Sequence, residues 1–179
     1  MTGKPAAVSP NASMKMSPKA KARMRATEKN IYKYYNDMGK NKGHCTWGAG
    51  ILAHRGVCTE EELGKKVSTE MVDQAFERKV REAEGIVRRN ITVSLNQAQF
   101  DSLCSLAYNA GAGGSSTTFK FVNKNDFAGA AANMALMIKV QVIEKGKKKY
   151  VIASGLIKRR AEEAAPFLIK DEAATAAAK

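Results

Sequence analysis

Residues 28–50 read EKNIYKYYNDMGKNKGHCTWGAG, and this stretch decides the fold. Its first part, Ile31 to Tyr35, has the aromatic and β-branched content of a β-strand. Glycines then interrupt the chain at short intervals, at Gly39, Gly43, Gly48, Gly50 and Gly56. Because Thr46-Trp47 and Ile51 to Ala53 lie between these glycines, the stretch predicts a small antiparallel sheet with tight turns.

Helices are expected on both sides of this sheet. Ser17-Pro18 is a typical helix start, with Ser as the cap and Pro in the first turn, and we expect that helix to run to about Lys29. Thr59 to Glu62 forms a capping-box pattern that opens a short helix. Residues 1–16 are rich in Pro, Ser, Ala and Lys without periodicity, which predicts a disordered basic tail or linker.

The second half of the chain is expected to be mostly helical. An apolar stripe predicts a long helix from Ser68 to near Arg89, on Val72, Phe76, Val80, Ala83 and Val87. Ser94 to Gln97 reads as a second capping box, opening a helix that stops at residues 111–114. Further helices are predicted over residues 115–122, 126–138 and 154–167. Residues 140–143 and 150–152 suggest a hairpin around Gly146, and residues 171–179 an Ala-rich, frayed tail.

This order of elements predicts an α+β fold within one domain, residues 17–170. A small antiparallel sheet lobe would be joined by a long helix to a helical lobe. Two lobes of this kind leave a cleft, which is where ligands usually bind.

Charge narrows the class of partner. The chain has 179 residues and a formal net charge of +13, which points to a polyanion such as nucleic acid, an anionic membrane or an anionic cell envelope. Nucleic acid is disfavoured, because the basic residues are spread widely and form no recognised binding motif. No stretch approaches the roughly 20 apolar residues of a membrane span, and the N-terminus lacks the apolar run of a signal peptide.

Two carboxylates fit a hydrolytic role. Glu28 falls at the predicted end of the first helix, and Asp37 falls in the turn after the first strand. Hydrolysis of a glycosidic bond needs one carboxyl group that stays protonated and one that stays ionised. Taken alone, each residue is more simply a surface or turn residue.

The wider pattern resembles the phage-type (T4-like) lysozymes. That family has a Glu, eight residues, an Asp, a short loop and then Thr-x-Gly-x-Gly, and here Glu28, Asp37 and Thr46 to Gly50 follow the same order. Residues 95–111 are similar to the family's central helix, and residues 155–162 to its last basic helix. The resemblance covers residues 20 to 168.

The resemblance implies a role for each matching residue. Glu28 would be the general acid, Asp37 would orient or activate the attacking water, and Thr46 would help to hold that water. The family inverts at the anomeric carbon, which requires a carboxyl separation of about 6.5–9.5 Å. No cofactor or metal is implied. Tyr108 and Asn109 match positions that line the family's sugar site. Arg159 matches an Arg that pairs with the catalytic Glu, and Arg160 is the second choice for that pairing.

Three departures from the family pattern are visible. The loop between Asp37 and Thr46 is longer than in well-known members, which makes the role of Thr46 less secure. Lys29 stands where the family usually has Gly, and Ile51 stands where most members have a structural His.

The cysteines and histidines allow two readings. His44, His54, Cys45 and Cys58 are the right types for zinc, but no Cys-x-x-Cys spacing is present. A Cys45–Cys58 disulfide across the sheet is favoured if the protein works in an oxidising compartment, with free thiols as the alternative. Cys104 lies on an apolar helix face and is expected to be an inert core residue.

The function predicted is therefore that of a monomeric muramidase acting on bacterial peptidoglycan in the periplasm or cell wall. It would be a phage endolysin released through a membrane pore, an injected antibacterial effector, or a domain of a larger protein. An effector would also have an immunity protein as a partner. The other hypotheses are a non-catalytic wall-binding relative and, less favoured, a nucleic-acid-binding protein. Lys147 to Lys149 could add electrostatic contact with an anionic envelope.

Overall fold

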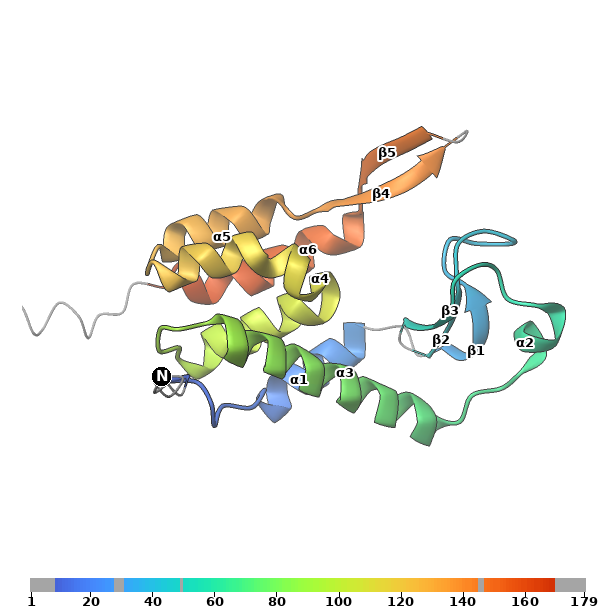
Figure 1. Ribbon diagram of the computed structural model, residues 1–179, viewed down its shortest axis with the longest axis horizontal. Helices are drawn as coiled ribbons and strands as arrows, with labels where there is room; N and C mark the ends of the chain where they lie inside the picture. The colour runs from blue at the N-terminus through green and yellow to red at the C-terminus, as the bar shows by residue number, and fades with distance from the viewer. Residues whose placement is uncertain (1–8, 28–30, 49, 145–146, 170–179) are drawn as a thin grey trace, which may run out of the picture. The chain divides into compact units, whose positions relative to one another are not determined.

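The computed structural model describes residues 9–27, 31–48, 50–144 and 147–169 (Figure 1). The chain divides into two compact units: residues 17–82 form one, and residues 1–16 with 83–179 form the other. The elements are those of an α+β protein, in which a small antiparallel sheet precedes a set of helices. The tail over residues 171–179 lies outside the described residues.

The unit of residues 17–82 contains the predicted sheet. Helix α1 (Pro18–Thr27) begins as expected, because the Ser17 hydroxyl accepts a hydrogen bond from the Ala20 amide at 3.2 Å. Strands β1 (Ile31–Asn36), β2 (Cys45–Gly48) and β3 (Ile51–His54) then form an antiparallel sheet in the order β1-β2-β3. Helix α2 (Glu60–Gly64) follows, and its capping box from Thr59 to Glu62 is confirmed.

Helix α3 (Thr69–Asn90) has residues in both units and is the long helix that the sequence predicts. The five apolar residues of the predicted stripe are all buried: Val72, Phe76, Val80, Ala83 and Val87. This helix of 22 residues has one apolar and one polar face. Most of its stability comes from packing the apolar face against other elements, while the polar face is exposed to water. The period of the sequence therefore identified this helix correctly.

The other unit is mainly helical. It contains α4 (Gln97–Asn123), α5 (Phe127–Leu136), α6 (Ser154–Ala164) and the short 3₁₀ turn η1 (Ala165–Phe167). Helices α4, α5 and α6 pack on one another. Their core includes Phe100, Leu103, Leu106 and Met134, all fully buried.

Helix α4 differs from the prediction at two points. Its N-cap is Asn96, whose side chain accepts from the Gln99 amide at 2.9 Å, so the capping box is Asn96 with Gln99 and not Ser94 with Gln97. The helical path is interrupted at Gly111, as predicted for residues 111–114, but it resumes at once and continues to Asn123. Gly111 has φ 68°, a conformation that glycine adopts without strain.

Residues 9–16 are ordered, contrary to the disordered tail expected over residues 1–16. The Asn11 side chain is buried, donates to the Val93 carbonyl at 2.9 Å and accepts from the Leu95 amide at 3.0 Å. Met16 is buried as well, and its amide donates to the Glu84 carboxylate at 2.8 Å. Individual hydrogen bonds to residues far away in the sequence hold this segment, and such contacts leave no periodic pattern in the sequence.

The predicted hairpin is present as β4 (Lys139–Glu144) and β5 (Lys147–Ile152). The strands pair antiparallel from Lys139 opposite Ile152 to Glu144 opposite Lys147. Figure 1 shows the hairpin extending away from helices α5 and α6, between which it lies in the sequence. In the described part of the chain, no helix is both long enough and apolar enough to cross a membrane.

Candidate active site

Asp37 closes the loop between β1 and β2. Its carboxylate Oδ1 accepts a hydrogen bond from the His44 amide at 2.8 Å, and its own amide donates to the His44 carbonyl at 3.1 Å. The Asp37 side chain is otherwise exposed. This two-bond closure holds the carboxylate at the end of β1 despite the length of the loop.

Thr46 is connected to the same residue. It is buried on β2, opposite Tyr35, and its hydroxyl donates to the His44 carbonyl at 3.2 Å. Since that hydroxyl's proton is used in this bond, its oxygen keeps acceptor capacity for another group. Asp37 and Thr46 are thus fixed through one shared backbone unit, that of His44.

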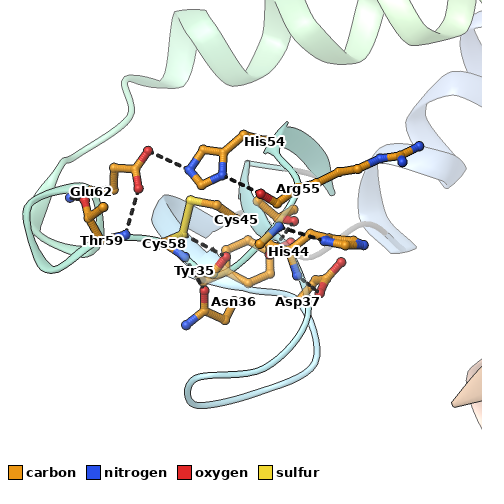
Figure 2. The surroundings of a disulfide bond; sticks show 12 residues. Tyr35, Asn36, Asp37, His44, Cys45, His54, Arg55, Cys58, Thr59 and Glu62 are labelled. Carbon is orange, nitrogen blue, oxygen red and sulfur yellow. Dashed lines mark hydrogen bonds and ion pairs between the residues drawn. A yellow bond between two sulfur atoms is a disulfide. The ribbon is translucent and has the colours of Figure 1, made fainter. Parts of the chain in front are cut away.

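A disulfide fastens this end of the sheet (Figure 2). Cys45 and Cys58 are joined, with their α-carbons 4.5 Å apart. The Cys45 amide donates to the Gly56 carbonyl, and the Cys58 amide donates to the Asn36 side chain, both at 2.7 Å. Cys45 lies between His44 and Thr46, so the disulfide ties the residues that hold Asp37 to the start of α2.

His54 and Glu62 form a hydrogen-bonded pair beside the disulfide, which becomes an ion pair when His54 is protonated (Figure 2). The His54 ring contacts the Glu62 carboxylate at 2.9 Å. A hydrogen bond with the Arg55 carbonyl, followed by the contact with Glu62, raises the pKa of His54. The pKa of Glu62 is lowered, first by its bond from the Thr59 amide and also by His54.

Potential metal ligands lie close together beside the disulfide. Among the described residues, Cys45, His54 and Glu62 bring potential ligand atoms within 4.8 Å of one another. The Cys45 sulfur is bonded to Cys58 in the structure, however, and zinc binds a thiolate. The donor set present therefore does not fit the zinc site considered from the sequence.

In the helical unit, a buried polar cluster joins α4 to α6. Arg160 and Glu163 are each 1% exposed and form an ion pair at 2.6 Å. The Ser105 hydroxyl donates to the Glu163 carboxylate at 2.6 Å, and the Ser102 hydroxyl donates to the Glu163 backbone carbonyl. Burial lowers the pKa of Arg160, and the Glu163 carboxylate opposes that shift.

The cluster ends on Asn109, a predicted sugar-contact residue. The Arg160 guanidinium donates to Asn109 Oδ1, and the rest of the Asn109 side chain is exposed. Guanidinium has only donors, so the amide must present its oxygen inward and its NH₂ group outward. The exposed group at this position is thus a hydrogen-bond donor.

The remaining predicted residues are placed as follows. Glu28 lies outside the described residues. Tyr108 is buried beside Asn109 on α4. Arg159 lies 3.6 Å from Glu163, and its side chain is 17% exposed against 1% for Arg160. Trp47 is half-buried, with its ring 6.4 Å from that of Tyr34. Cys104 is buried as expected, and burial raises the pKa of its thiol.

Comparison with known proteins places these residues in a family. Residues 25–163 match the phage lysozyme family. The chain belongs to that family. An endolysin of Acyrthosiphon pisum secondary endosymbiont phage 1 is 30% identical over 139 residues, which cover 76% of this chain and 92% of that endolysin.

Solved structures of phage lysozymes have the same fold. The endolysin of Escherichia coli O157:H7 phage FAHEc1 has a TM-score of 0.69 and 30% identity, covering 87% of this chain and 94% of that one. A point mutant of P22 lysozyme has a TM-score of 0.60 and 25% identity, covering 87% and 99%. The lysozyme-like α+β fold is therefore confirmed.

The predicted site residues of this phage lysozyme are divided between its two units. Asp37 and Thr46 belong to the sheet unit, whereas Tyr108, Asn109 and Arg159 belong to the helical unit. Sequence reasoning missed His44, which binds Asp37 and Thr46 through its backbone, and Glu163, which holds Arg160. The signal that would have indicated the pairing of Arg160 with Glu163 is their spacing, three residues apart on a helix.

Proposed function

We propose that this chain is a muramidase that hydrolyses the β-1,4 bond between N-acetylmuramic acid and N-acetylglucosamine in bacterial peptidoglycan. The observation that carries the proposal is the match to the phage lysozyme family over residues 25–163, a span that includes every proposed site residue. The chain would act in the periplasm or cell wall of a bacterium, as a phage endolysin released through a pore or as an injected effector.

The chemistry assigned to the sheet unit follows from Asp37 and Thr46. An inverting glycosidase needs a carboxylate base that activates water and an acid that protonates the leaving oxygen. The Asp37 carboxylate is exposed and held at one oxygen by the His44 amide, so it is positioned yet accessible. The Thr46 oxygen would accept a hydrogen bond from the same water. Glu28 would be the acid, and its proton is the one that the leaving oxygen takes.

Binding of the sugar would use the helical unit. Saccharides carry acetamido carbonyls and hydroxyls that accept hydrogen bonds, and Asn109 presents an outward NH₂ donor. Tyr108 would line the same site, and Arg159, which matches the family's arginine at the catalytic centre, would belong to it as well. These assignments require no cofactor.

The test is the loss of turbidity of purified peptidoglycan. Glu28→Gln keeps the side chain's size and removes its ionisable proton, and we expect clearing to fall at least a hundredfold, the range in which general acids contribute. Glu61→Gln makes the same chemical change on α2, where the side chain is 83% exposed, and should clear at the wild-type rate.

The other possible results of the turbidity test would each support a different function or mechanism. If the wild type does not clear the suspension but sediments with it, the chain is a wall-binding relative without catalysis. If it neither clears nor sediments and is instead retained on DNA in a salt-sensitive way, the net charge serves nucleic-acid binding. Equal clearing by Glu28→Gln and the wild type would remove Glu28 from the mechanism.

A further inference from the structure

One segment of the helical unit combines exposed apolar side chains with basic ones. We use the name hairpin segment for residues 136–144 and 147–158, which lead from the end of α5 through strands β4 and β5 into α6. Five large apolar side chains in it are between 39% and 75% exposed: Leu136, Val140, Tyr150, Ile152 and Ile157. Exposed apolar side chains concentrated in one segment mark an interaction site more often than side chains scattered singly over the surface do.

The charge of the hairpin segment is strongly positive. Its sequence contains one acid, Glu144, and five lysines, at positions 139, 147, 148, 149 and 158. Lys148 and Lys149 are exposed on β5, next to Tyr150. A surface with this composition is complementary to one that is both apolar and anionic.

The two faces of the hairpin are each partly apolar. Tyr150 and Ile152 are two residues apart on β5 and so share a face, whereas Val140 pairs with Val151 on the other. A lone two-stranded hairpin is only marginally stable in water and gains from being covered. The Tyr150 hydroxyl bonds to Gln141 at 3.3 Å, which gives this aromatic residue one polar end and one apolar face.

We propose that the hairpin segment docks on the surface of an anionic phospholipid bilayer. Lysines next to such a surface bind lipid phosphates, Tyr sits at headgroup depth, and aliphatic side chains enter the acyl boundary. A glycan offers hydrogen-bond acceptors to the lysines. It offers little to Ile152 and Leu136, because aliphatic side chains form no hydrogen bonds with its hydroxyl and amide groups. The docking needs no peptidoglycan hydrolysis, so it stands or falls separately from the muramidase activity.

The experiment is flotation of the full chain with phosphatidylglycerol vesicles, compared with phosphatidylcholine vesicles. Two double variants remove one feature each. Tyr150→Ser with Ile152→Ser removes exposed apolar surface, and should lower partitioning about tenfold or more. Lys148→Gln with Lys149→Gln removes charge, and should also lower it at least about tenfold, since each lysine near an anionic surface contributes roughly fivefold.

Matched controls separate the segment from the protein as a whole. Leu168→Ser with Ile169→Ser removes two apolar side chains that are 64% and 72% exposed outside the segment. Arg78→Gln with Arg81→Gln removes two positive charges from the exposed face of α3. Both controls should float as the wild type does, and circular dichroism checks that all four variants are folded.

A probe placed in the hairpin reports the contact directly. Tyr150→Trp should shift its fluorescence to shorter wavelength with phosphatidylglycerol vesicles and not with phosphatidylcholine vesicles. The proposal is overturned if the wild type does not float, if the probe does not shift, or if the controls lose as much binding as the hairpin variants. It is also overturned if the hairpin variants lose binding to purified peptidoglycan while still floating, because a glycan would then be the partner.

Discussion

At the scale of single residues, Asp37 depends on the absence of a side chain at position 43. A Cβ atom on Gly43 would lie 2.0 Å from Asp37 Oδ1, whereas one on Gly39 would meet nothing within 4 Å. Both glycines have positive φ, 83° and 97°, so alanine strains the backbone by about 1–2 kcal/mol at either site. Only Gly43→Ala must also displace the carboxylate.

We therefore expect Gly43→Ala to lower the rate of peptidoglycan clearing by about tenfold to a hundredfold, as a displacement of about 1 Å does in other sites. Gly39→Ala should lose similar stability in thermal unfolding and keep most of its activity. If the two variants lost activity equally, strain in the loop and not the position of Asp37 would be the cause.

Glu163 is the residue on which the buried cluster of the helical unit depends. Neutralising it leaves the Arg160 guanidinium buried without its ion-pair partner at 2.6 Å. Removing one member of a buried pair costs about 3–5 kcal/mol, so Glu163→Gln should lower the free energy of unfolding by about that amount. Chemical denaturation measures it.

The control is the neighbouring acid. Glu162→Gln alters a contact at 4.0 Å with Lys158, whose side chain is 88% exposed, and surface pairs of this kind contribute about 0–1 kcal/mol. A small effect of Glu163→Gln, equal to that of Glu162→Gln, would show that Asn109 satisfies Arg160 without the carboxylate's charge.

At the scale of elements, the start of α4 can be tested by its cap. Asn96→Ala removes the side chain that accepts from the Gln99 amide, and should cost about 1 kcal/mol of stability. Ser94→Ala changes the residue that the sequence pattern favours as the cap, and should cost less than half of that. Thermal unfolding of the two variants decides between the caps, and the reverse order of stability would restore Ser94.

Some of these elements could be predicted from the sequence and others could not. Helix α3 follows from its apolar stripe and α2 from its capping box, because both depend on residues close in the sequence. Ser94 and Asn96 each stand three residues before a Gln, so local pattern offered two caps and only the fold selects one. The burial of Asn11 against residues 93 and 95 is a long-range contact that no local pattern contains.

The same limit applies to the site. Its residue types at Asp37 and Thr46 came from the family pattern, yet their shared anchor on His44 uses the backbone amide and carbonyl, which every residue other than proline carries. The inward oxygen of Asn109 depends on Arg160, which is 51 positions away. Such contacts need the packed helices α4 and α6, so they could not be predicted from spacing.

At the scale of the whole molecule, the disulfide belongs to one unit only. Cys45 and Cys58 both lie within residues 17–82, and they close a loop of 13 positions. A loop of that size contributes about 3 kcal/mol in the chain-entropy description. Reduction should therefore destabilise the sheet unit, while Cys104, the free cysteine, stays buried in the other unit.

Two probes can follow the units separately in a denaturant titration. Trp47 is the chain's one tryptophan and lies in the sheet unit, whereas circular dichroism is dominated by helices, of which α4, α5 and α6 are in the other. With dithiothreitol, the Trp47 transition should move to lower denaturant by more than the helical transition does. The Cys45→Ser, Cys58→Ser variant should show the same separation without reductant and no further change with it. If both transitions moved together, the two units would unfold as one cooperative body, since the loss of a constraint in one would then be shared by the other.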